Sequence, residues 1–129
     1  YNIDLKKLYP SNAFCVKIRL GGTNRRKKAA MLFKAIGDKS KPAILFFHAM
    51  GVTGDSSMPV AKCLEKKYYC IMPTSTVYCA GQEYRSKTDE IQQILKFLKE
   101  KEIKEIELVV ASSIGADLAM AFLTNGIWQ

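Results

Sequence analysis

Two adjacent serines and a glycine separate an apolar run from an amphipathic run in the stretch VVASSIGADL. A serine on a sharp strand-to-helix turn can act as a nucleophile, because the turn exposes its hydroxyl at the end of the sheet. Such a turn requires small residues two positions before and two positions after the nucleophile. Ala111 and Gly115 flank Ser113 at this distance, whereas both residues at that distance from Ser112 are β-branched. The spacing therefore favours Ser113 as the nucleophile and leaves Ser112 as a variable residue inside the turn.

The helix that follows this turn can also contribute to catalysis. Its positive end points at Ser113, and the backbone N–H of Ile114 is placed to act as an oxyanion donor. The alternative is a plain turn in which a serine caps the helix, because a small-x-Ser-x-Gly pattern is short. Asp117, in the first helical turn, is expected to stabilise the helix N-terminus rather than to act as a catalytic acid.

Strands and helices alternate along the chain from residue 43 onward. This order predicts an α/β fold, with a mostly parallel sheet and helices on both faces. In such sheets the functional site lies at the carboxyl ends of the strands, here the loops 49–56 and 112–115. The expected strands are Ala43 to His48, Tyr68 to Met72 and Ile106 to Ala111, and the expected helices run over 57–66, from Thr88, and over 115–124.

The first two of these helices carry recognisable start signals. Ser57 is expected to cap the first helix, with Pro59 tolerated in its first turn, and Thr88 to cap the second. The first helix is expected to bury Val60, Cys63 and Leu64. The second carries the clearest apolar stripe of the chain, formed by Ile91, Ile94, Leu95 and Leu98.

The first third of the chain reads as a β-hairpin. Phe14 to Leu20 and Ala29 to Ile36 are its expected strands, and the dense basic run from Arg25 to Lys28 lies in the connection. The net charge is +8, from 20 Lys and Arg against 12 Asp and Glu, but outside this run the charges are scattered. We therefore expect a solvated hairpin tip and neither nucleic acid nor membrane as a partner.

The cysteines and the single histidine argue against a metal site. The chain has four cysteines with no CxxC pair, and His48 is its only histidine. A dinucleotide-binding GxGxxG is absent too, so no cofactor is expected. Free thiols are typical of the reducing cytoplasm, which is the expected location, and Cys70 is expected to be a packing residue.

The chain resembles the N-terminal half of the α/β-hydrolase family. The resemblance covers Phe14 to Thr124 and rests on the motifs FFHAMG and ASSIG and on the loop after YYCIMP. It implies that Ser113 is the nucleophile and that the N–H groups of Met50 and Ile114 hold the oxyanion. Ala49 stands where the family usually has glycine directly after the histidine.

The resemblance also implies which residues support the site and which are missing. His48 is expected to order the oxyanion loop rather than to act as the base, and Ala111 and Gly115 to shape the turn. In this family the order along the chain is Ser, then Asp or Glu, then His. No histidine follows Ser113, and no acidic residue follows Asp117. We therefore expect residues 1–129 to be a single domain truncated after the elbow helix.

Two functions follow from this reading. The first is a serine hydrolase acting on a small-molecule ester, thioester or amide, completed by a C-terminal segment or another chain. The second is a non-catalytic half-domain that self-associates or binds a protein. The strand Ile106 to Ala111 would then be an edge with an uncovered apolar face, which invites pairing in a homo-oligomer.

Overall fold

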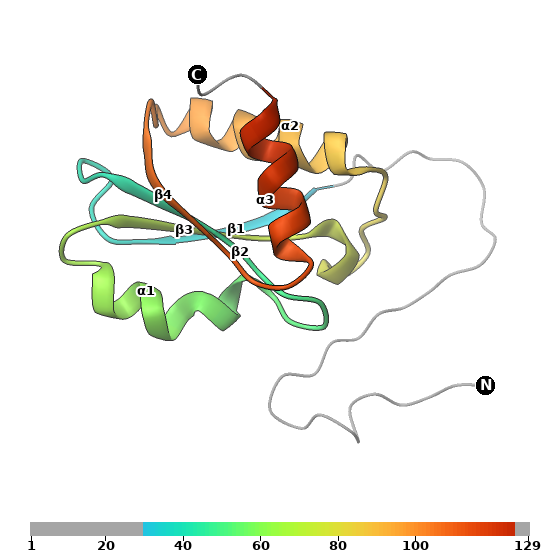
Figure 1. The fold of residues 1–129 in the computed structure, drawn as a ribbon, viewed down its shortest axis with the longest axis horizontal. Helices are drawn as coiled ribbons and strands as arrows, with labels where there is room; N and C mark the ends of the chain where they lie inside the picture. Colours follow the sequence, from blue (N-terminus) through green and yellow to red (C-terminus); the bar gives the residue numbers. More distant parts are fainter. Residues whose placement is uncertain (1–29, 126–129) are drawn as a thin grey trace.

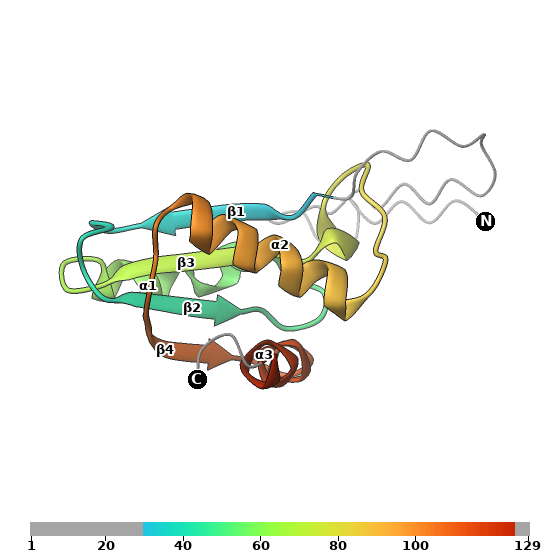
Figure 2. The ribbon, with the colours of Figure 1, turned by 90° about the horizontal axis from the view of Figure 1, so that it is seen from above.

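The computed structural model describes residues 30–125, which form a four-stranded sheet in the order β1-β3-β2-β4. Figure 2 shows this order, with α2 crossing the near side of the sheet and α1 behind it. β2 is parallel to both β3 and β4, whereas β1 runs antiparallel to β3. The prediction of a mostly parallel sheet is confirmed. The strands are β1 (Leu32–Ile36), β2 (Ala43–Phe47), β3 (Tyr69–Thr74) and β4 (Ile106–Ala111).

The helices cover both faces of the sheet, as predicted. Figure 1 shows α1 on one side and α2 and α3 on the other. Short 3₁₀ turns precede α1 and follow β3, at Gly54–Ser57 and Thr76–Tyr78. The helices are α1 (Met58–Leu64), α2 (Lys87–Glu100) and α3 (Gly115–Thr124).

β2 lies in the centre of the core, and all five of its residues are buried. Its side chains alternate between the two faces, because successive residues of a strand point in opposite directions. Leu45 and Phe47 pack with the buried residues of α2 and α3, including Ile94 and Phe122. Ile44 and Phe46 pack on the other face with Ala61 of α1 and with the buried Cys70 and Met72. The continuous apolar run AILFF therefore reflects a strand covered on both faces.

The predicted buried face of α1 is wrong for two of its three residues, and so is the predicted cap. Val60 is 53% exposed, Cys63 is exposed and Leu64 is only partly buried, whereas Ala61 is fully buried. Ser57 makes no side-chain cap, because the preceding 3₁₀ turn already places its backbone in the helical region. α1 therefore packs on the sheet through Ala61, with the partly buried Met58 and Leu64 beside it.

α2 begins two residues earlier than the predicted cap implies. Its cap is Ser86, not Thr88: the Ser86 backbone is extended and its hydroxyl accepts a hydrogen bond of 3.1 Å from the N–H of Asp89. The predicted apolar stripe is confirmed. Ile91, Ile94 and Leu98 are buried, and Leu95 is partly buried against the same core.

Part of the predicted N-terminal hairpin is present in the described residues. β1 forms the expected return strand within residues 29–36, and within 30–125 its partner is β3. The expected strand Phe14 to Leu20 and the basic run lie outside the described residues. No helix between residues 30 and 125 is long and apolar enough to cross a bilayer.

β4 is an edge strand in the described sheet, as expected, and pairs only with β2 there. Leu108 is 51% exposed and Val110 is 38% exposed. α3, which lies on the other face of the sheet, also exposes Met120 and Leu123. This side of the fold therefore presents both unpaired strand backbone and apolar surface.

Candidate active site

The turn between β4 and α3 holds Ser113 in the left-handed backbone region. Its φ is +52°, and Glu102 is the other non-glycine residue of positive φ in the described chain. Ser112 N–H donates a 3.1 Å hydrogen bond to Phe47 O, so the first serine still extends the pairing of β4 with β2. The reversal of the chain therefore falls on Ser113, as a nucleophile elbow requires.

Gly115 allows α3 to begin against the end of β2. A Cβ added there would lie 2.6 Å from the carbonyl oxygens of both Phe47 and His48. Because these are backbone atoms, they could not move away easily. The position therefore needs glycine for close approach. Ala111, the other predicted small residue of the turn, is exposed.

The backbone N–H groups of the two predicted oxyanion donors have no hydrogen-bond partner in the described part of the chain. Within residues 30–125, neither the Met50 N–H nor the Ile114 N–H donates a hydrogen bond. The loop that carries Met50 is nevertheless held by hydrogen bonds from two of its backbone N–H groups. Gly51 N–H donates to the Tyr78 hydroxyl at 2.8 Å, and Gly54 N–H donates to Thr74 Oγ1 at 2.9 Å.

His48 directly follows β2, and both of its ring nitrogens make hydrogen bonds. Its Nε2 accepts a hydrogen bond of 3.0 Å from Ser75 N–H. Nε2 must therefore be unprotonated, so Nδ1 carries the proton and donates to Ala49 O at 2.8 Å. The role of His48 as an ordering residue stays a prediction, and these contacts support it over a role as base.

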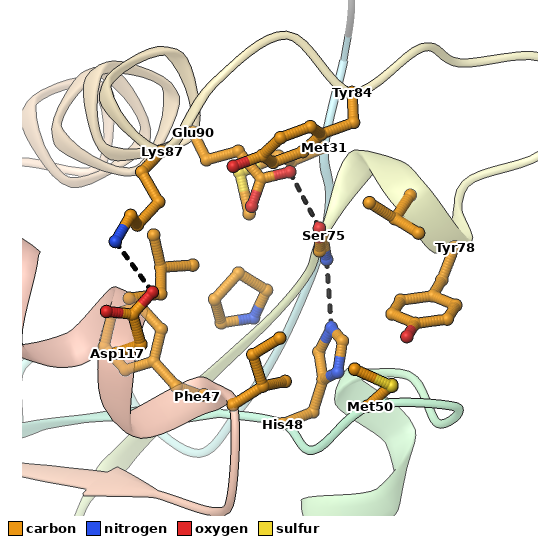
Figure 3. A pocket seen from close by; sticks show the side chains of 15 residues that line it. Met31, Phe47, His48, Met50, Ser75, Tyr78, Tyr84, Lys87, Glu90 and Asp117 are labelled. Carbon is orange, nitrogen blue, oxygen red and sulfur yellow. Dashed lines mark hydrogen bonds and ion pairs between the residues drawn. The ribbon is translucent and has the colours of Figure 1, made fainter.

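A cavity of about 500 Å³ opens between these loops and α2 (Figure 3). This volume suits a small-molecule ligand. Ser113 does not line it, but the two residues that follow it do. The lining residues that the site uses are Phe47, His48, Met50, Ser75, Glu90, Ile114, Gly115 and Asp117, with Met31, Pro73, Val77, Tyr78, Tyr84, Lys87 and Leu118 completing the wall.

Glu90 is a pocket residue that the sequence reasoning missed. It is 2% exposed, and its Oε1 accepts hydrogen bonds from the Ser75 hydroxyl, the Thr76 N–H and the Thr76 hydroxyl at 2.7–2.8 Å. Carboxylates are almost never fully buried without partners. The available signal was its position, four residues before Ile94 on the apolar face of α2, where a charged residue is out of place.

An ion pair between α2 and α3 lines the same cavity. Lys87 Nζ lies 2.7 Å from Asp117 Oδ2, and both side chains are about half exposed. The hydrogen bond that Lys87 Nζ donates to Asp117, and then the negative charge of Asp117, raise the pKa of the Lys87 ammonium. Asp117 therefore has a partner from a helix far away in the sequence, in addition to its place in the first turn of α3.

Solved structures resemble the described fold, whereas no protein-family model and no curated protein matches the sequence. A protein assigned to the α/β-hydrolase family, from Desulfitobacterium hafniense, gives a TM-score of 0.68 at 17% identity, covering 75% of this chain and 40% of that one. A protein assigned as a hydrolase, from Rickettsia typhi, gives 0.61 at 22% identity, covering 76% and 37%. The structure of 1H-3-hydroxy-4-oxoquinoline 2,4-dioxygenase gives 0.61 at 19% identity, covering 71% and 36%.

These likenesses show the fold and leave the reaction open. The described residues form part of the α/β-hydrolase fold, and the chain spans well under half the length of the structures it matches. Proteins named as a hydrolase and as a dioxygenase share this part of the fold. Because function depends on the site rather than on the fold, the chemistry must be argued from the residues at the turn and in the cavity.

Proposed function

We propose that this chain, whose described residues form part of the α/β-hydrolase fold, carries the nucleophile and oxyanion donors of a serine hydrolase. Ser113 Oγ would attack the carbonyl carbon of a small ester, thioester or amide. The N–H groups of Ile114 and Met50 would stabilise the oxygen that becomes negative. The observation that carries the proposal is the positive φ of Ser113 beside a glycine that tolerates no side chain.

The proposal needs a general base that these 129 residues do not contain. His48 is the only histidine of the sequence, and both of its ring nitrogens already have partners. Formation of the acyl-enzyme requires a base that takes the Ser113 proton as Oγ attacks the carbonyl carbon and gives it to the leaving group as that bond breaks. A histidine and a carboxylate from further polypeptide or from another chain would complete the site. An oxyanion hole alone still gives some rate enhancement.

A fluorophosphonate probe tests this proposal, because it phosphonylates an activated serine. The chain is incubated with excess probe, with and without imidazole as an external base, and the modified residue is located by mass spectrometry. We expect an adduct on Ser113 that forms faster with imidazole. The adduct should be lost in Ser113→Ala and kept in Ser112→Ala. Equal labelling of the two variants, or no adduct in the folded wild type, would rule out the assignment.

The exposed edge of the sheet favours a second function, association with a second copy of the chain. β4 has no second neighbour among the described strands, so two copies could pair their β4 edges and bury the apolar side chains of β4 and α3. Light scattering at micromolar concentration should then give a dimer or larger species. Leu108→Lys should yield monomer, while Val60→Lys, at a similarly exposed residue of α1, should not. A monomeric wild type would contradict this function.

A further inference from the structure

The buried carboxylate of Glu90 holds the segment that follows β3. One oxygen, Oε1, accepts all three hydrogen bonds from Ser75 and Thr76, and both residues lie directly after the strand. Burial of a carboxylate is unfavourable unless such donors compensate for the lost water. Hydrogen bonds to a charged acceptor are also about twice as strong as neutral ones. α2 therefore fixes the main chain of Ser75.

Ser75 connects Glu90 to His48 through two hydrogen bonds. Its hydroxyl is bound by Glu90, while its backbone N–H donates to His48 Nε2. Figure 3 shows the three side chains in this order, joined by two dashed lines. The far ring nitrogen, Nδ1, donates to Ala49 O. A continuous series of hydrogen bonds thus links helix α2 to the loop after β2, from one wall of the cavity to the other.

The last link sets the direction of the Met50 N–H. The peptide between Ala49 and Met50 is planar, and in a trans peptide the C=O and N–H point in opposite directions. When the imidazole holds Ala49 O on one side, the Met50 N–H must point to the other. That N–H has no hydrogen-bond partner within residues 30–125. Its orientation is therefore determined by the contact made to the neighbouring carbonyl.

We propose that Glu90 is a positioning residue that orients the Met50 N–H through Ser75, His48 and Ala49. The use of this orientation in catalysis rests on the proposed function, in which the Met50 N–H is an oxyanion donor. The orientation itself does not depend on that function. This positioning role differs from simple stabilisation of the segment after β3, because it requires the hydrogen bonds that run from Glu90 through Ser75 to His48. We call this series of hydrogen bonds the path.

Three conservative variants separate this series of hydrogen bonds from general stabilisation of the segment after β3. Ser75→Ala removes the hydroxyl that joins Glu90 to the path. Thr76→Val, the matched control, removes another hydroxyl from the same carboxylate oxygen and leaves the path intact. Glu90→Gln keeps an acceptor oxygen but not the charge, so it should partly preserve the path. Circular dichroism melting curves establish that each variant is folded at the temperature of measurement.

The measurement is NMR of the isotope-labelled full chain. The two ring nitrogens of His48 report its tautomer, and the amide resonances and hydrogen exchange of residue 75 and of Met50 report the hydrogen bonds. We expect wild type to hold the Nδ1–H tautomer. In Ser75→Ala, exchange of the residue-75 amide should rise about tenfold, the equilibrium factor of one net hydrogen bond. The Met50 amide resonance should shift as well, with a smaller change in Glu90→Gln and none in Thr76→Val.

The outcomes distinguish the two proposals. If His48 and Met50 resonances are unchanged in Ser75→Ala and Glu90→Gln, or change equally in Thr76→Val, Glu90 is not a positioning residue. This result would leave Ser113 labelling unaffected. If wild type forms no fluorophosphonate adduct but the resonances change as expected, the path exists and the proposed hydrolase function fails. If both proposals hold, Ser113 should be labelled about tenfold more slowly in Ser75→Ala than in Thr76→Val, because the Met50 N–H is then misdirected.

Discussion

Replacing each of the two adjacent serines with glycine should change stability in opposite directions. Ser113 has a φ of +52°, a region in which an L-residue is strained by contact of its Cβ with the backbone. Ser112 is not among the residues of positive φ, and its N–H pairs with Phe47 O. Glycine therefore relieves strain at the first position and relieves none at the second.

The size of the effect follows from two opposing contributions. The left-handed conformation costs an L-residue about 1–2 kcal/mol. Glycine loses more conformational entropy on folding, which costs about 0.5–1 kcal/mol. Ser113→Gly should therefore raise the free energy of unfolding by about 0.5–1 kcal/mol, and Ser112→Gly should lower it by about the same amount. The two variants should differ by about 1–2 kcal/mol.

Urea unfolding of the two variants, followed by circular dichroism, measures this difference. The transition midpoints can be compared directly if the slope of the free energy against urea is unchanged. Both variants remove one exposed hydroxyl from the same turn, so each controls for the composition of the other. If Ser113→Gly unfolds at the same or lower urea concentration than wild type, the turn is not strained at Ser113. Ser113 would then not occupy the strained backbone conformation that a nucleophile elbow requires.

Three further changes test other parts of the structure. Gly115→Ala should destabilise by about 1–3 kcal/mol in urea, since its Cβ would lie 2.6 Å from two carbonyl oxygens; wild-type stability would contradict that packing. Glu102→Gly should stabilise by about 0.5–1 kcal/mol, seen as a higher melting temperature, because Glu102 ends α2 at a φ of +59°. Burial raises the pKa of the Cys70 and Cys79 thiols above 9.0. Under reducing conditions the contribution of these thiols to stability should be fully present below pH 9 and be lost as pH rises through their folded-state pKa values, and replacing both residues with alanine should weaken this pH dependence.

The alternation of strands and helices could be read from the sequence because it depends on local pattern. AILFF is apolar throughout and forms the central strand, while the i, i+3, i+4, i+7 stripe of α2 faces the core as expected. The bounds of β4 and α3 also agree with the prediction. Ser113 was preferred over Ser112 from side-chain size alone, which is a local requirement of a sharp turn.

The short helix α1 shows where local pattern failed. Its larger apolar residues suggested the buried face, yet Ala61 packs on the sheet and Val60 is exposed. The helix has only seven residues and follows a 3₁₀ turn, so its rotation is set by the chain entering it. A helix this short gives too few turns for periodicity to identify a face.

What the sequence determined by itself was the fold class, the central strand and the serine at the turn. Only the tertiary structure placed Glu90 against Ser75 and Lys87 against Asp117. These pairs join segments separated by 15 and 30 residues. Which segments meet depends on the strand order β1-β3-β2-β4, which brings the ends of β2, β3 and β4 to one edge. Local periodicity carries no information about such neighbours, because contacts across a sheet are fixed by the packing of whole elements.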